Sequence, residues 1–339
     1  SPLHRRLELS RCVAKLLEQA PDRAPRAALS ELSDSRRAFR WPRRCWMFEP
    51  SDSPHIFATP PGVDFAQSLV EGLLRRGEDR TPDTWARTEI YVNTRRMQRR
   101  IRSVFDAGPA RLLPRVRLIT DLAMDPVALQ IPPAVSPLHR RLELSRFVAK
   151  LLEQAPDLAP RAALYDLSDS LAKLMDEMQG EGVGPDTIAG LDVTDQSGHW
   201  DRALRFLKII APFFGDTDAP PDKEARQRMV IEELARAWAD RPPSHPIIIA
   251  GSTGSRGATA LFMQAVARLP QGAIVLPGYD FNLPTPVWQG MDDAMTAEDH
   301  PQFRFRHLME LIGFAPDDVA LWSDRPPAQP ARNRLISLS

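Results

Sequence analysis

Two turns rich in glycine or proline stand where an α/β protein would carry a phosphate-binding loop. The first is Pro60-Pro61-Gly62, which follows a short apolar run. The second begins after the apolar segment Ile247–Ala250 and consists of Gly251, Ser252, Thr253, Gly254, Ser255, Arg256 and Gly257. Such turns expose backbone N–H groups at the start of a helix, and this arrangement binds anions. The hypothesis that follows is a phosphate or nucleotide site at one of these turns.

Neither turn carries the side chains that ATP hydrolysis requires. A P-loop ends in Gly-Lys followed by Ser or Thr, with the Lys on the phosphates and the hydroxyl on magnesium. The second turn has Arg256, Gly257 and Ala258 at these positions. In the first turn, two prolines remove backbone donors. We therefore expect degenerate loops and a chain that is itself non-catalytic. The alternative is a phosphate- or nucleotide-binding α/β enzyme that uses the Gly251–Gly257 loop.

A dense group of arginines follows the apolar run Glu89–Val92. Its members are Arg95, Arg96, Arg99, Arg100 and Arg102. Helical periodicity from Arg95 to Phe105 places them opposite an apolar stripe. No acidic residue follows at the i+4 spacing before the end of this predicted helix. Uncompensated positive charge at a strand–helix junction suits contact with a nucleic-acid backbone. The other interpretation is an ordinary solvated helix face.

No further grouping of side chains predicts catalysis or a metal site. The acidic pairs Asp176-Glu177 and Asp292-Asp293 lack a histidine or a third carboxylate at ligand spacing, so we interpret them as surface positions. The two cysteines, Cys12 and Cys45, do not have the spacing of a metal site. We expect no metal and no cofactor in this chain.

Apolar runs alternate with amphipathic segments on both sides of a helical middle. The predicted strands are 55–59, 89–92, 116–119, 247–250 and 273–276, and the predicted helices of the middle are 137–154, 160–179, 199–214 and 223–239. This alternation predicts an α/β fold, a doubly wound parallel sheet interrupted by a helical insertion. We place the first part of the α/β domain at 47–130, the insertion at 131–243 and the second part at 244–339. The final apolar run, Leu335–Leu338, is interpreted as the start of a further strand in a truncated chain.

Composition narrows the class of protein. The 339 residues include 43% hydrophobic ones, which is enough for the cores of two domains. The formal net charge is zero, so contact with a polyanion would have to come from local patches. No apolar run has the length of a membrane span, and the first residues lack the apolar segment of a secretory signal. We expect a protein of a reducing compartment without a membrane partner.

Residues 1–35 repeat residues 136–170 almost unchanged. The two copies differ at four places, namely Cys12 for Phe147, Arg23 for Leu158, Ser30 for Tyr165 and Glu31 for Asp166. We interpret 1–46 as a duplicated or spurious segment ahead of a start at Met47. The reason is that three of the changes put Cys, Arg or Ser in place of apolar or aromatic residues and would spoil a buried helix face. The alternative is a basic, aromatic arm that binds nucleic acid.

Four blocks of the sequence carry a family resemblance. They are Ala58-Thr-Pro-Pro-Gly-Val-Asp-Phe65, Val92-Asn-Thr-Arg-Arg-Met-Gln-Arg-Arg100, Leu174-Met-Asp-Glu-Met-Gln-Gly-Glu-Gly182 and Ala250-Gly-Ser-Thr-Gly-Ser-Arg-Gly-Ala-Thr259. In this order they resemble the N-terminal half of AddB, a subunit of the bacterial AddAB helicase–nuclease that processes DNA double-strand breaks. The resemblance extends from Ile56 to Ser339.

The resemblance implies a superfamily-one helicase fold of RecA-like type whose ATP-hydrolysis motifs have decayed. Pro60–Asp64 then stands in place of the phosphate loop, and Ala250–Ser255 in place of the acidic magnesium-binding motif, without its acids. Asn93 and Thr94 stand near the motif that contacts single-stranded DNA. The DNA-binding set expected on this basis is Asn93, Thr94, Arg95, Arg96, Arg99 and Arg100.

The same resemblance implies the partners and the cellular setting. The chain would belong to an ATP-dependent helicase–exonuclease complex in homologous recombination. Its partners would be an AddA-type motor subunit, DNA ends and single-stranded DNA in the bacterial cytoplasm, associated with the nucleoid. ATP and magnesium would bind the partner subunit. The iron–sulfur cluster and the nuclease carboxylates would lie in a C-terminal domain beyond this sequence.

Overall fold

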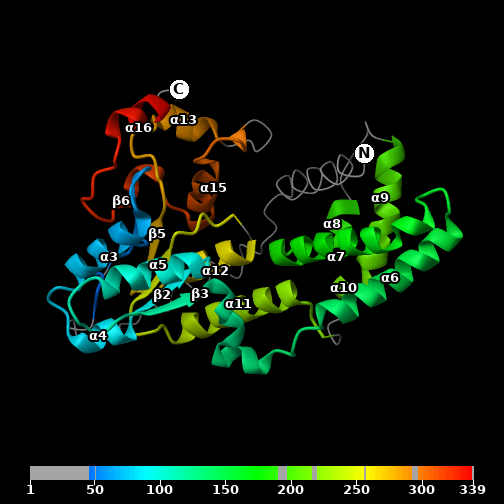
Figure 1. Ribbon diagram of the computed structural model, residues 1–339, viewed down its shortest axis with the longest axis horizontal. Helices are drawn as coiled ribbons and strands as arrows, with labels where there is room; N and C mark the ends of the chain where they lie inside the picture. Colours follow the sequence, from blue (N-terminus) through cyan, green and yellow to red (C-terminus); the bar gives the residue numbers. More distant parts are fainter. Residues whose placement is uncertain are drawn as a thin grey trace. The chain divides into compact units, whose positions relative to one another are not determined.

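The computed structural model describes residues 46–49, 51–189, 197–215, 220–255, 257–291 and 297–337. It divides into two compact units, which are coloured along the chain in Figure 1. The helical unit contains Asp125–Val230, and the α/β unit contains the described residues up to Met124 and from Ile231 onward. Apart from Trp46, the segment 1–46 lies outside the described residues, as do Arg256 and the pair Asp292-Asp293.

The α/β unit is built on one six-stranded sheet. Its strands are β1 (Ile56–Ala58), β2 (Glu89–Val92), β3 (Arg115–Leu118), β4 (Ile247–Ala250), β5 (Gly272–Leu276) and β6 (Ala320–Leu321). The order across the sheet is β3-β2-β4-β5-β1-β6, and each neighbouring pair is parallel. The predicted parallel α/β sheet is thereby confirmed, and it is consistent with a RecA-like fold.

Helices cover both faces of this sheet (Figure 1). On one face lie α3 (Phe65–Arg76) and α5 (Arg95–Asp106), and on the other lie α12 (Gly257–Ala267) and α15 (Phe303–Ile312). Alternate residues of β2 point to opposite faces, as the pleat of a strand requires. Ile90 and Val92 join the core beneath α3 and α5, whereas the Tyr91 ring packs edge-on against Phe262 of α12 with centroids 5.0 Å apart. The remaining helices of this unit include α4 (Pro82–Arg87), α13 (Thr285–Gly290) and α16 (Pro330–Ser337), with the 3-10 turns η3 (Ile119–Met124) and η6 (Pro316–Asp318).

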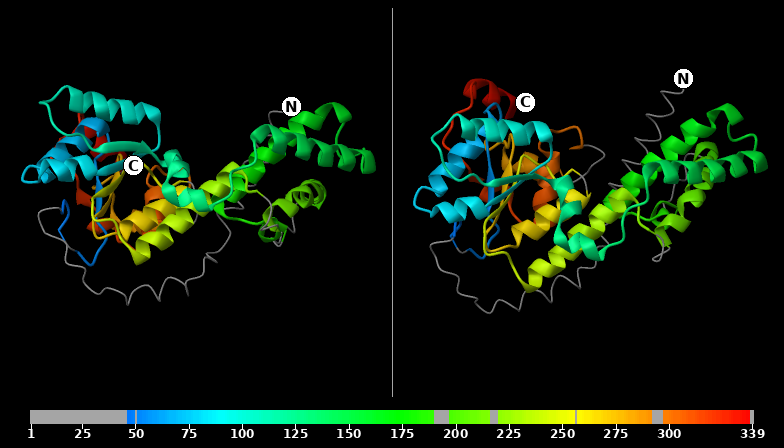
Figure 2. Two further views of the ribbon diagram at one scale, coloured as in Figure 1. Left: turned by 90° about the horizontal axis from the view of Figure 1, so that it is seen from below. Right: turned by 60° about the horizontal axis from the view of Figure 1, so that its bottom comes forward.

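The helical unit is held together by the apolar faces of three helices. Its elements are η4 (Pro126–Gln130), α6 (Pro137–Gln154), η5 (Arg161–Ala163), α7 (Leu164–Glu181), α8 (Pro185–Ala189), α9 (Ser197–Ile210), α10 (Pro212–Gly215) and the first part of α11 (Lys223–Asp240). α6 and α7 pack side by side (Figure 2). Val148 of α6, Met175 of α7 and Ile210 of α9 are fully buried in their shared core. A buried ion pair, Arg140 Nε to Asp222 Oδ1 at 2.7 Å, ties α6 to the start of α11.

The end of the chain differs from the prediction. Leu335–Leu338 was expected to be a strand, but α16 covers Pro330–Ser337, and Leu335 is exposed rather than buried. The strand of this region is β6, two residues long and pairing with β1. It is fixed by Trp322, whose ring is fully buried and whose Nε1 donates to the Leu69 carbonyl at 3.0 Å. The sequence did not predict β6, because two exposed residues followed by one buried tryptophan do not show the alternation typical of a strand.

The residues of 136–170 that differ from the copied segment are less buried than expected. Phe147 is 42% exposed and Tyr165 is 60% exposed. Asp166 is exposed as well, and Leu158 is partly buried. Phe147 of α6 and Tyr165 and Asp166 of α7 are therefore exposed, contrary to the expectation of a buried helix face, and only Leu158, which lies between the two helices, packs against the core.

Candidate functional site

Both glycine or proline turns and the start of α5 lie at the same edge of the sheet. Because all strands are parallel, their carboxyl ends share one edge, and ligands of open parallel sheets gather there. Pro60-Pro61-Gly62 follows β1, Asn93 and Thr94 follow β2, and Gly251–Ser255 follows β4, the neighbour of β2. The structure thus brings together the three segments that the sequence singled out.

The first turn is packed against another part of the chain. The side-chain amide of Asn333 on α16 donates to the Pro61 carbonyl at 2.7 Å, and the backbone N–H of Ala328 donates to the Gly62 carbonyl at 3.4 Å. Both prolines lack an N–H to offer an anion. The turn therefore has the features of a packed connection, with its carbonyls engaged and few donors available for a phosphate.

The glycines of the second turn have a structural explanation. Gly251 and Gly254 both adopt positive φ, 76° and 67°, a region that glycine enters without steric cost. A Cβ at Gly251 would lie 3.1 Å from the Phe65 ring, and one at Gly254 would lie 3.0 Å from a methyl of Leu308. Backbone conformation and apolar packing therefore account for Gly251 and Gly254, two of the three glycines of this turn, without a ligand.

The helix α5 presents its arginines to solvent. Thr94 caps its first turn, since Thr94 Oγ1 accepts a hydrogen bond from the N–H of Met97 at 3.2 Å. Ile101 and Phe105 are buried against the sheet. The exposed residues at its start and along its outer side are Asn93, Thr94, Arg95, Arg96, Arg99, Arg100 and Arg102. The amphipathic pattern of the sequence thus places the charge outward, as predicted.

The arginines of α5 differ in their partners. Arg100, predicted to be uncompensated, forms an ion pair with Asp64 at 2.7 Å. The i+4 rule misses this pair because Asp64 caps the neighbouring helix α3. The hydrogen bond from Arg100 holds the pKa of the Asp64 carboxyl below its usual value. In contrast, Arg95, Arg96 and Arg99 have no ion-pair or hydrogen-bond partner within the part of the chain that the structure describes.

The order of charges along α5 opposes its helix dipole. Arg95 and Arg96 occupy the first turn, which contains no acidic residue, and Asp106 is the last residue. The N-terminus of a helix carries partial positive charge, so each arginine there is unfavourable by about 0.3–1 kcal/mol. An anion in front of α5 would reverse the sign of that interaction and would meet the free N–H groups as well. The arrangement is therefore unfavourable for the free helix and favourable for bound phosphate.

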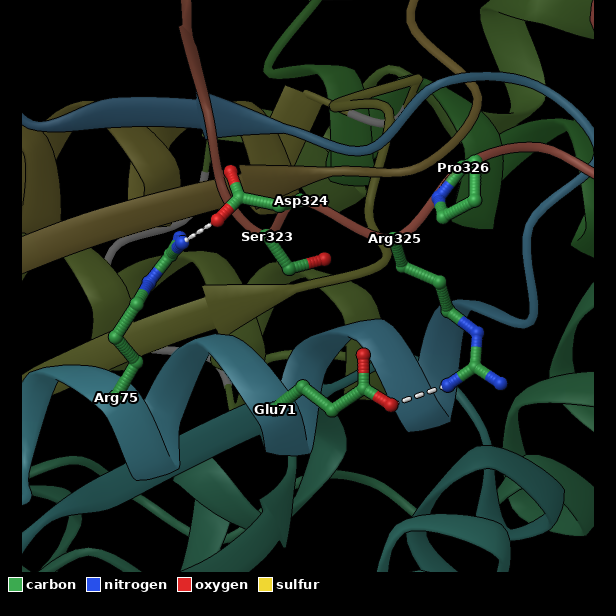
Figure 3. Close-up of a pocket in the computed structure, with 6 residues that line it drawn as sticks. All are labelled: Glu71, Arg75, Ser323, Asp324, Arg325 and Pro326. Carbon is green, nitrogen blue, oxygen red and sulfur yellow. Dashed lines mark hydrogen bonds and ion pairs between the residues drawn. The ribbon is translucent and has the colours of Figure 1, made fainter.

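A second charged surface, between α3 and the segment after β6, serves folding. It lines an open cavity of about 580 Å³ formed by Glu71, Arg75, Ser323, Asp324, Arg325 and Pro326 (Figure 3). The dashed lines in Figure 3 mark two ion pairs, Arg75 with Asp324 and Arg325 with Glu71. Each charge on this surface already has a partner of opposite sign, so the surface does not call for an ionic ligand.

A buried polar cluster in the sheet was not among the predicted sites. The carboxylate of Glu89 accepts a hydrogen bond from the Tyr91 hydroxyl at 2.8 Å and lies 3.3 Å from Arg117 Nη1. Glu89 and Tyr91 stand directly across from Arg115 and Arg117 in the sheet register, a pattern that pairing of β2 with β3 would have revealed. Nearby, burial lowers the pKa of His245. The polar groups of this cluster satisfy one another.

The acidic pair Asp176-Glu177 is exposed, as expected for a surface position. Partial desolvation of its carboxyl group and the charges of Glu224 and Asp222 nevertheless raise the pKa of Asp176 to about 6. Within the described ranges, no group of three or more His, Cys, Asp or Glu residues is arranged to hold a metal ion. No helix among these residues is long and apolar enough to cross a membrane.

No protein-family model matches this sequence, and no curated protein matches it. The AddB resemblance thus depends on the four sequence blocks given above.

Proposed function

We propose that this chain is the helicase-like N-terminal scaffold of an AddB-type subunit in double-strand break repair, and that it contacts DNA through the start of α5. The observation that carries this proposal is the set of three exposed arginines, Arg95, Arg96 and Arg99, without partners among the described residues. They lie at the ligand-binding edge of a parallel sheet, on a helix whose dipole they oppose. Backbone phosphates of DNA would supply the negative charges that these arginines do not find among the described residues.

The two degenerate turns support a scaffold rather than a motor. Neither turn contains a lysine, and packing against Phe65 and Leu308 explains Gly251 and Gly254 of the second turn. In this proposal ATP and magnesium act on an AddA-type partner, and the nuclease with its iron–sulfur cluster belongs to a C-terminal domain outside this sequence. The complex would act in the bacterial cytoplasm, at the nucleoid.

The DNA contact is tested by binding of a fluorescent single-stranded oligonucleotide across a salt series. We expect Arg95→Ala/Arg99→Ala to weaken binding and to flatten the salt dependence by about 0.7 units of slope for each lost phosphate contact. A matched control, Arg87→Ala/Arg161→Ala, removes two exposed arginines that already pair with Asp83 and Glu153. The control should leave the slope near that of the parent. Equal slopes for the parent and both variants would exclude α5 as the DNA site.

A nucleotide-binding enzyme remains the alternative, because the Gly251–Gly257 loop precedes the N-terminus of α12. A ligand that binds only the folded state raises the melting temperature, and the rise grows with the logarithm of the ligand concentration relative to its dissociation constant. We expect ATP with magnesium to leave the melting temperature of the chain unchanged and to undergo no hydrolysis. A nucleotide-dependent shift, together with magnesium-dependent turnover that disappears in Arg256→Ala, would favour the enzyme.

A further inference from the structure

The arginines of α5 form one continuous arc around the helix. At about 100° per residue, their order across the arc is Arg102, Arg95, Arg99, Arg96 and Arg100. Both ends of the arc are anchored to the fold. Arg102 donates to the carbonyl of Val116 in β3 at 3.3 Å, and Arg100 Nη2 donates to Asp64 Oδ2 at 2.7 Å. The three arginines assigned to DNA contact therefore lie between two anchored ones.

The two anchors differ in the charge that they leave for a ligand. A carbonyl is neutral, so Arg102 keeps its full positive charge. The carboxylate of Asp64 is negative, and the hydrogen bond from Arg100 keeps its pKa below the usual value, so it stays ionised near neutral pH. The Arg100 side chain is 48% exposed and that of Asp64 is 37% exposed, so both are accessible from solvent. Asp64 therefore offsets the positive charge at this end of the arc.

Asp64 is held beside Arg100 by a second hydrogen bond. Its Oδ1 accepts from the N–H of Gln67 at 3.1 Å and caps α3, while its Oδ2 faces Arg100. An anionic oxygen that accepts from a guanidinium is also the contact that a phosphate makes. Because the fold positions this carboxylate, it contacts Arg100 without the loss of translational freedom that binding of a DNA strand entails. Asp64 thus has an advantage over phosphate at this one arginine.

We propose that Asp64 is an internal competitor of the DNA backbone, which occupies Arg100 as a phosphate would and thereby limits the affinity of the α5 site. The inference rests on the function proposed above, because it concerns the control of that same site. It assigns Arg100, which the sequence grouped with the DNA-binding residues, to the regulation of binding. In a complex that moves along DNA, such a competitor keeps the contact with the strand readily reversible.

A double-mutant cycle tests the competition, with the fluorescent single-stranded oligonucleotide and the salt series described above. Asp64→Asn keeps a good cap and removes the competing charge. We expect it to bind the oligonucleotide roughly five-fold more tightly at about 0.1 M salt and to steepen the salt dependence by about 0.7 units of slope, for one added phosphate contact. Arg100→Ala should remove this gain in the Asp64→Asn background and leave the slope of the parent unchanged.

Asp106→Asn is the matched control, because Asp106 is an exposed acid on the same helix. It removes one negative charge without releasing Arg100, so its salt dependence should equal that of the parent. Equal gains in Asp106→Asn and Asp64→Asn would mean that net charge alone sets the affinity, and this would overturn the proposal. An equal effect of Arg100→Ala on the slope in both backgrounds would overturn it as well.

The variant Arg95→Ala/Arg99→Ala separates this inference from the function on which it rests. If that variant loses DNA affinity while Asp64→Asn binds as the parent does, the competition fails and the DNA site stands. If Arg95→Ala/Arg99→Ala binds with the affinity and the slope of the parent, α5 is not the DNA site and both proposals fail.

Discussion

The helices α3 and α5 lie side by side on the same face of the sheet, and their charges are arranged in opposite ways (Figure 1). α3 begins with the acidic cap Asp64 and ends with Arg75 and Arg76, which is the order that a helix dipole favours. α5 begins with Arg95 and Arg96 and ends with an acid. Both helices have twelve residues and each follows a parallel strand, so the contrast is not one of length or position.

The contrast between α3 and α5 separates charges that stabilise the fold from charges that have no role in its packing. On α3, Glu71 and Arg75 pair with the segment after β6, and Arg76 donates to the Trp322 carbonyl at 2.8 Å. Among the residues that the structure describes, Arg100 is the only arginine of α5 that pairs with an acid, and that acid is the cap of α3. We therefore attribute the charges of α3 to the stability of the fold and those at the start of α5 to a ligand.

The largest expected effect concerns Trp322, the buried side chain that holds α3 against the segment after β6. Trp322 is fully buried, packs edge-on against Phe57 and donates a hydrogen bond to α3. Trp322→Ala should lower the free energy of unfolding by about 3–5 kcal/mol, the range for removal of a buried large aromatic side chain. Urea denaturation measures the loss.

Leu321→Ala is the matched control, because Leu321 directly precedes Trp322 and is 44% exposed. Its effect should stay within about 0.5 kcal/mol, as for most surface substitutions. If both variants lost the same stability, the segment after β6 would not hold α3 in place.

A smaller effect is expected at the other end of α3. Asp64 accepts a hydrogen bond from the N–H of Gln67 at 3.1 Å and pairs with Arg100. Asp64→Ala should lower the free energy of unfolding by about 1 kcal/mol, mainly through loss of the cap. Arg100→Ala leaves the cap and removes only a half-exposed ion pair, so its effect should be below that of Asp64→Ala. The reverse order in urea denaturation would mean that the pair, and not the cap, stabilises α3.

The charge of Asp64 gives a pH dependence with a defined sign. The pKa of this carboxyl is lowered in the folded chain, chiefly by the hydrogen bond from Arg100. Its ionised form is therefore stabilising above the ordinary Asp pKa of about 3.9, and this contribution is lost as the pH falls through the lowered value. Asp64→Asn keeps a good cap but does not titrate. The stability difference between the parent and Asp64→Asn should shrink on acidification below about pH 4, and a constant difference would contradict the assignment.

Much of the fold could be predicted because its elements carry strong local signals. The strand Ile247–Ala250 and the helix Pro137–Gln154 have the bounds that the sequence indicated. One is an unbroken apolar run between Pro246 and a glycine, and the other begins with a serine cap and a proline. In contrast, both residues of β6 are exposed, and the strand is held in position by the buried Trp322 that follows it. No local sequence pattern therefore predicts this strand.

The candidate site was only partly accessible from the sequence for the same reason. Amphipathicity located the arginine side of α5 and strand alternation located the edge of the sheet. The pair between Arg100 and Asp64 joins residues 36 positions apart and depends on α3 lying beside α5. The packing of Phe65 and Leu308 around the second turn is likewise tertiary, so a glycine-rich loop alone could not distinguish a phosphate cradle from a packed turn.

The most direct test of the account is one variant measured for both stability and DNA binding, Arg95→Glu/Arg96→Glu. Reversing two charges at the N-terminus of α5 should raise the free energy of unfolding by about 0.6–2 kcal/mol for each residue, because an unfavourable arginine is replaced by a favourable acid. The same variant should lose affinity for single-stranded DNA and show a flatter salt dependence. Lower stability with unchanged DNA affinity and salt dependence would contradict the claim that these charges are placed for a ligand and not for the fold.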